Sequence, residues 1–154
     1  MIPDYLLRLA DGQSLDGATT KTTSAVDLDT LRDIGTGTTM YLRIRFDTAY
    51  THSTGGSNIV FGYADNDSAS NLVILGQLQL GVGASVPAQG EVIYFTIPPL
   101  SKVKLGALPN NTKKYFLVQH VPFSGTPSGG SWTVEIVTEI NMVEHTYTKG
   151  FTVQ

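Results

Sequence analysis

Short runs of alternating apolar and polar residues extend along the whole chain, and Gly, Pro, Asn, Asp or Ser interrupts them at intervals of about ten residues. The clearest run covers residues 40–46, where every second residue is apolar: Met40, Leu42, Ile44 and Phe46. Successive side chains of a β-strand point to opposite faces, so this alternation is typical of a strand with one buried face. The dominant pattern therefore predicts a β-sheet protein.

Similar runs predict the other strands of an all-β domain. Near the C-terminus the alternation places Trp132, Val134 and Ile136 on one face, and Gly76 marks a bulge in an earlier run. About eight strands at this spacing are typical of a sandwich, a jelly roll or a barrel. The predicted strands are residues 5–9, 24–28, 40–46, 58–64, 72–80, 91–97, 114–121 and 132–140.

Polar and glycine-rich stretches separate these strands and are predicted to be surface loops. The only helical signal is a single turn near Thr30–Ile34. No linker divides the chain, and 154 residues are enough for one self-sufficient core. We therefore expect one β-sandwich domain over residues 1–154, with N- and C-terminal segments extended toward neighbouring subunits. The main predicted loops are residues 11–24, 48–57 and 125–130.

Charge and composition narrow the classes of function. Charged residues make up only 15% of the chain, the net charge is −3, and basic residues cluster no further than pairs such as Lys113-Lys114. The electrostatic signature of nucleic-acid binding is therefore missing. There is no cysteine, hence no disulfide and no thiolate nucleophile. No apolar run approaches the ~18 residues of a membrane span, and the N-terminus lacks the pattern of a signal peptide. We expect synthesis in the cytoplasm and no membrane partner.

The polar residues form no recognisable catalytic or metal-binding motif. His52, His120 and His145 lack the spacing of a metal site and are expected to be solvated or hydrogen-bonded structural residues. Residues 65–68, Asp-Asn-Asp-Ser, carry alternating oxygen donors, but the later glycine and glutamate of a calcium loop are missing, so they predict a β-turn. We therefore expect no enzymatic activity, no cofactor and no metal site.

Arg43 and Arg45 alternate with the apolar residues of the 40–46 strand and are predicted to point outward. The simplest interpretation is an ordinary solvated sheet face, on which exposed ion pairs contribute about 0–1 kcal/mol. Two alternatives remain open: pairing with outward acids such as Glu135 and Glu139, if the strands are neighbours, or contact with a partner surface.

The two ends of the chain resemble a known family. Residues 4–15, 24–28 and 31–37, which include Val26-Asp27-Leu28 and Arg32-Asp33-Ile34-Gly35, are similar to the opening of capsid cement proteins of short-tailed Bordetella phages. Residues 147–153 are similar to the ending of the same family. The resemblance covers about a third of the chain, since residues 50–127 match only in their number of strands.

This resemblance implies a jelly-roll-like subunit that binds the outer surface of a tailed-phage head and stabilises the capsid lattice. It implies the major capsid protein and further copies of the chain, as a dimer or trimer, as partners, and it brings no catalytic residues. Because termini of such folds are free to extend, we expect Met1–Leu9 and Thr146–Gln154 to form inter-subunit contacts. The candidate contact residues are Tyr5, Leu7, Arg43, Arg45, Tyr147 and Phe151.

The main alternative is a carbohydrate-binding, lectin-like β-sandwich. Such sites favour exposed aromatic platforms, and the only tryptophan, Trp132, has the pattern of a core residue. The candidate platforms are Tyr41, Tyr50, Tyr63 and Tyr147.

Overall fold

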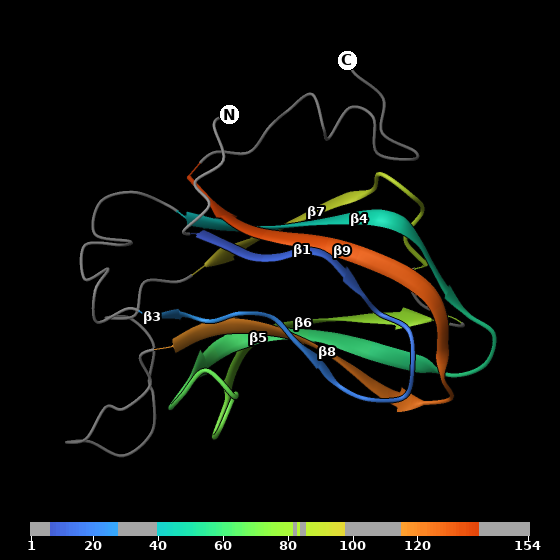
Figure 1. The fold of residues 1–154 in the computed structure, drawn as a ribbon, viewed down its shortest axis with the longest axis horizontal. Helices are drawn as coiled ribbons and strands as arrows, with labels where there is room; N and C mark the ends of the chain where they lie inside the picture. The colour runs from blue at the N-terminus through green and yellow to red at the C-terminus, as the bar shows by residue number, and fades with distance from the viewer. Residues whose placement is uncertain (1–6, 28–39, 82, 84–85, 98–114, 139–154) are drawn as a thin grey trace.

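The computed structural model describes residues 7–27, 40–81, 83, 86–97 and 115–138. These residues form nine strands, arranged as two antiparallel sheets that pack face to face (Figure 1). The strands are β1 (Arg8–Ser14), β2 (Lys21–Thr22), β3 (Val26–Asp27), β4 (Met40–His52), β5 (Gly56–Ala64), β6 (Val73–Gly81), β7 (Val92–Ile97), β8 (Tyr115–Ser124) and β9 (Pro127–Val137).

The order of the strands is that of a jelly roll. One sheet has the order β1-β9-β4-β7 and the other the order β2-β8-β5-β6, with β3 also paired to β8. Strands β2 and β3 are thus two halves of one interrupted edge strand. Apart from the step from β2 to β3 and the β5–β6 hairpin, every connection along the chain crosses from one sheet to the other. The predicted jelly-roll-like sandwich of about eight strands is therefore confirmed.

The hydrophobic core lies between the two sheets, and the alternation in the sequence identifies much of it. The apolar faces predicted for residues 40–46 and 132–136 both point inward, and Leu42, Ile44, Phe46, Trp132 and Val134 are all 0% exposed. The opposite sheet supplies residues of the same alternation, Ile59, Phe61 and Tyr63 from β5 and Phe116 and Val118 from β8.

Three of the predicted loops contain strand residues, so those predictions were wrong in part. β1 extends to Ser14, β4 continues to His52, and β9 already begins at Pro127. The pairing between β4 and β9 shifts register between Phe46 and Thr48 and again before Thr51, and these shifts interrupt the alternation from which strands are predicted. The predicted helical turn at Thr30–Ile34 lies outside the described residues.

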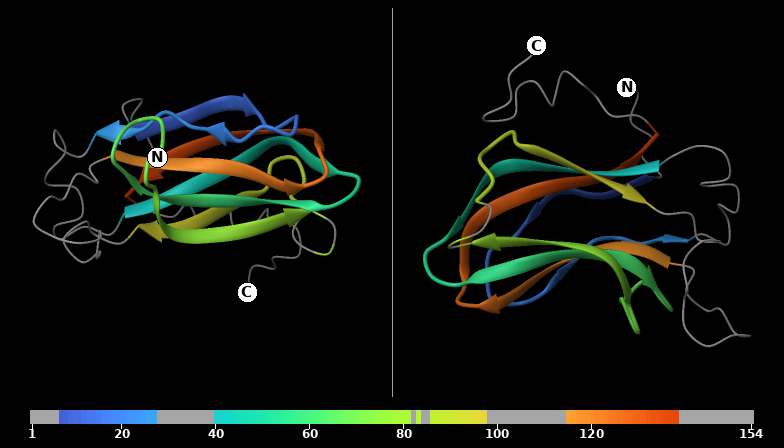
Figure 2. Two further views of the ribbon diagram at one scale, coloured as in Figure 1. Left: turned by 90° about the horizontal axis from the view of Figure 1, so that it is seen from below. Right: turned by 180° about the vertical axis from the view of Figure 1, so that it is seen from behind.

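The β4–β5 and β8–β9 turns join the two sheets at one end of the sandwich (Figure 2). Each of these turns contains a glycine with a positive φ. Gly55 and Gly125 have φ values of 86° and 69°, in the region that favours glycine. A Cβ atom on Gly125 would overlap the carbonyl oxygen of Thr54, and one on Gly55 would overlap that of Ser124. The β4–β5 and β8–β9 turns therefore lie backbone against backbone.

Two local predictions in the β5–β6 hairpin are confirmed. The Asn66 side-chain oxygen accepts hydrogen bonds from the backbone N–H groups of Ser68 and Ser70, both at 3.0 Å, which closes the predicted turn. The predicted bulge near Gly76 appears as a register shift, because Phe61 pairs with Gly76 while Gly62 pairs with Ile74.

We predict that the bulge makes Gly62 intolerant of a side chain. A Cβ atom at this position would overlap the carbonyl oxygen of Val73. Gly62→Ala should lower the free energy of unfolding, measured by chemical denaturation, by about 3 kcal/mol. Gly12→Ala is the control, because Gly12 has open space and only a positive φ of 62°, and it should cost about 1 kcal/mol. Equal effects of the two substitutions would contradict this account.

Candidate functional surfaces

A ladder of charged side chains crosses the outer face of the β1-β9-β4-β7 sheet. The register places Arg8, Glu135 and Arg43 side by side on three neighbouring strands. Arg8 Nε donates to Glu135 Oε1 at 3.0 Å, and Arg43 Nη1 donates to Glu135 Oε2 at 3.1 Å. One carboxylate is therefore shared by two guanidinium groups, with Arg8 also bound to Asp11 at 3.2 Å.

Arg43 and Glu135 are buried, with only 4% and 7% of their surface exposed. The interpretation of Arg43 as part of a solvated face was therefore wrong, and the alternative of pairing with Glu135 is correct. Alternation places Arg43 outward but cannot show how closely neighbouring side chains cover it. Glu139, the other acid considered, lies outside the described residues.

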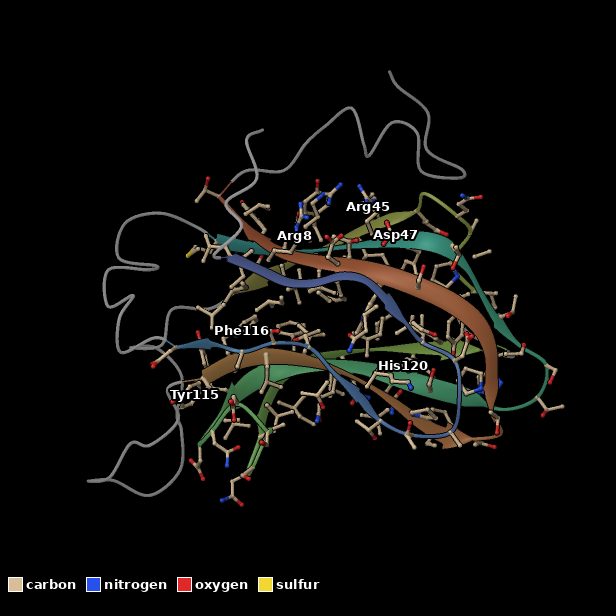
Figure 3. The ribbon with its side chains drawn as sticks, in the orientation of Figure 1. Arg8, Arg45, Asp47, Tyr115, Phe116 and His120 are labelled. Atoms are coloured by element: carbon tan, nitrogen blue, oxygen red, sulfur yellow. The ribbon has the colours of Figure 1, made fainter. Side chains whose placement is uncertain are left out.

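A second polar group lies next to this ladder, around Asp47. Arg45 Nε donates to Asp47 Oδ1 at 2.8 Å, and Thr133 Oγ1 donates to Asp47 Oδ2 at 2.6 Å. Thr133 Oγ1 also accepts the backbone N–H of Gly12 at 3.2 Å, so the group links β1, β9 and β4. The Arg45 side chain is 44% exposed. Figure 3 shows Arg8, Arg45 and Asp47 on the outside of this sheet.

The described candidate contact residues are held by the protein's own fold. Leu7 packs against the hydrophobic core, Arg43 is paired with Glu135, and Arg45 is bound to Asp47. The expectation that Met1–Leu9 serves partner contact fails for its last residue, because Leu9 is a core residue with 3% exposure. Tyr5, Tyr147 and Phe151 lie outside the described residues, as does Thr146–Gln154.

A cluster of polar aromatic residues lies inside the sandwich, near the glycine-dependent turns. His120 is 0% exposed, and its Nε2 atom lies 2.8 Å from Ser57 Oγ and 3.3 Å from Tyr50 Oη. The Tyr50 hydroxyl is also hydrogen-bonded to Ser57. The His120 ring meets the rings of Tyr50 and Trp132 edge-on, with centroids 5.7 Å and 6.2 Å away.

His120, within β8, is therefore a hydrogen-bonded structural residue, as predicted. Burial, together with the proximity of His52 and Lys21, lowers its pKa from 6.5 to about 4. His52 is buried as well, and both of its ring nitrogens are without a hydrogen-bond partner among the described residues, so the expectation of a solvated or hydrogen-bonded side chain is wrong for His52. Sequence spacing could not predict this cluster, because its members come from β4, β5 and β8.

The distance between Ser57 and His120 is that of a nucleophile and its general base. Both residues are 0% exposed, so a substrate has no access to the Ser57 hydroxyl. The described residues contain no group of three or more His, Cys, Asp or Glu side chains that could hold a metal ion. The arrangement therefore acts as a polar contact between the two sheets.

Two of the predicted aromatic platforms are wrong. Tyr50 and Tyr63 are 1% and 3% exposed, because their rings lie in the core on the inner faces of β4 and β5. Trp132 is 0% exposed, as its pattern predicted. Tyr41 is partly exposed, and Tyr147 lies outside the described residues.

Comparisons with protein-family models and with curated proteins found no match to this sequence. The described part of the chain contains no helix with the length and apolarity needed to cross a bilayer.

We predict that Glu135→Gln destabilises the fold strongly. Arg43 stays buried but loses the Glu135 carboxylate, and breaking a buried pair of this kind costs about 3 kcal/mol or more. The measurement is the free energy of unfolding in urea. The double variant Arg43→Met/Glu135→Met removes both charges and should be more stable than Glu135→Gln. A double variant that is as unstable as the single variant would show that the ion pair is not the cause.

We predict that the protein loses stability on mild acidification through His120. Its pKa is about 4 in the folded protein and 6.5 in the unfolded chain, so the unfolded chain binds the proton first. The contribution of His120 is complete above pH 6.5 and is lost as the pH falls toward 4, by about 3 kcal/mol. His120→Gln removes the titrating group, so its stability should depend less on pH in this window. Parallel pH profiles of the two proteins would refute the assignment.

Proposed function

We propose that this protein is a virion structural protein, a capsid cement protein that binds the outer surface of a tailed-phage head. The single observation that carries the proposal is the unequal distribution of charge over the two sheets. β5, β6 and β8, which make up most of the second sheet, contain no Asp, Glu, Lys or Arg residue, and the charges on its described strands are Lys21 of β2 and Asp27 of β3. The first sheet carries six charged residues on the described strands β1, β4 and β9: Arg8, Asp11, Arg43, Arg45, Asp47 and Glu135.

An uncharged sheet face is suited to docking against another protein. Burying a charge in an interface requires a partner charge, whereas Gln, Gly and apolar side chains lose little on dehydration. Two large apolar side chains of the second sheet, Ile74 and Phe123, are 52% and 53% exposed. The charges of the first sheet are largely engaged in pairs within the subunit. The second sheet is therefore the better candidate for contact with a capsid.

The resemblance of the chain ends to capsid cement proteins supports the same proposal, and the jelly roll is the fold that this resemblance implies. The proposed partners are the major capsid protein and further copies of this chain, and the proposed location is the capsid exterior. A protein that binds only the assembled shell stabilises it by its binding free energy, and many copies multiply a modest contribution.

We predict that heads without this protein release their DNA at a lower temperature. Heads from a phage that lacks the gene would be compared with wild-type heads by the temperature of DNA release, followed with a dye. Because binding to the assembled state alone stabilises it, the loss of all copies should lower the release temperature by several degrees. Purified protein added back to the deficient heads should restore the release temperature.

The add-back experiment has a matched control. A variant with a charge in the uncharged face, Ile74→Glu, should bind the deficient heads less well than the wild-type protein, because the glutamate would be desolvated in the contact. Thr19→Glu places the same charge on an exposed residue of the β1–β2 connection and should bind normally. Unchanged head stability without the protein would refute the proposed function.

A further inference from the structure

The two open sides of the sandwich, where the edge strands of the sheets lie, are built differently. On one side the edges are β1 and the β2/β3 pair. Here the backbone N–H of Ser24, in the connection between β2 and β3, donates to the carbonyl of Leu9 in β1 at 2.9 Å. β1 is also interrupted by two register shifts, and β2 and β3 have two residues each. Short, irregular edges of this kind resist pairing with another chain.

The other side has the edges β6 and β7 and is less protected. β6 is nine residues long, and neither strand contains a charged residue or a proline. Among the described residues, each has a strand neighbour on one side only. The register of β6 with β5 is regular from Gly76 to Gly81, so only the bulge near Leu75 interrupts this edge. A long uncharged edge presents a row of backbone N–H and C=O groups to another strand.

The core is also incompletely covered on this side. Four apolar residues that pack against the core here remain partly exposed, whereas on the opposite side only Leu7 and Ala10 do so among the described residues. Phe61 crosses the gap between the sheets, because its ring lies over Gly76 and its centroid is 5.1 Å from that of Phe95. We name this region the open seam; it consists of Leu75, Leu78, Ile93 and Phe95.

We propose that β6 pairs antiparallel with β6 of a second copy of this chain, so that the two second sheets join across a two-fold axis. The pairing would centre on residues 76–80, where β6 is regular. It would satisfy the free backbone edge of both copies and cover part of each open seam. This inference deepens the proposed assembly role and rests on it only for its biological purpose, because self-association is a property of the isolated protein.

A second copy is the occupant that the edge fits best. An antiparallel strand edge is complementary to itself, so two identical strands meet without adaptation. Two chains with a net charge of −3 repel each other, and an uncharged edge is where they can meet with no contact between like charges. Gln77 and Gln79 are exposed on β6, and their side-chain amides can bond to the same residues of the second copy.

The test is the oligomeric state of the full-length protein in solution, measured by analytical ultracentrifugation. The wild-type protein should be a dimer. Gln77→Lys places two like charges diagonally across the two-fold axis on the same face of the joined sheet, and should raise the dimer dissociation constant by about tenfold or more. Gln77→Glu should have the same effect alone, and an equal mixture of the two variants should form heterodimers. Thermal unfolding of each variant checks that the subunit fold is retained.

Two controls decide which edge is used. Thr19→Lys, on the β1–β2 connection, should leave the dimer intact. Thr96→Lys tests β7, the other uncharged edge. A wild-type monomer at the highest attainable concentration, or a dimer that only Thr96→Lys disrupts, would overturn the proposal. A monomer that still stabilises heads would overturn the pairing of β6 alone and leave the proposed function standing.

Discussion

The burial of one apolar face of each sheet against the other is the interaction on which the rest of the structure depends. Because strand side chains alternate, packing the inner faces of β4 and β9 onto β5 and β8 fixes which residues remain outside. Glu135 and Arg43 then lie on an outer face yet are buried by their neighbours, and they satisfy each other as an ion pair. Inside, His120, Ser57 and Tyr50 form the polar contact between the sheets near the glycine turns. Both polar groups are consequences of the same packing.

Much of the fold could be predicted from the sequence, because two-residue alternation reports directly on the buried face of a strand. It identified the inner faces of β4 and β9 and the bulge near Gly76. It failed where register shifts break the alternation, as in the last part of β4. The ion pair at Glu135 was considered but not favoured, since the sequence does not show which strands are neighbours. The His120 cluster could not be predicted, because three separate strands bring its members together.

The distribution of charge links the fold to the proposed role. The first sheet binds its charges largely internally, and β5, β6 and β8 of the second sheet present an uncharged surface that includes the edge strand β6. A subunit built in this way offers a partner uncharged surface area and backbone hydrogen bonds. The buried Ser57 and His120 pair illustrates the difference, because its atoms have the distance of a catalytic pair and no access to solvent. Surface contact is the activity that this arrangement favours.

The central claim is that the protein acts through its exterior. The most direct measurement is amide hydrogen exchange of the protein free in solution and bound to purified phage heads. The account predicts that binding adds protection to exposed positions of the second sheet beyond the β6 edge, which the second copy already covers, and leaves the exchange of residues around Ser57 and His120 unchanged. Added protection confined to the neighbourhood of Ser57 and His120, together with binding of a small molecule there, would contradict it.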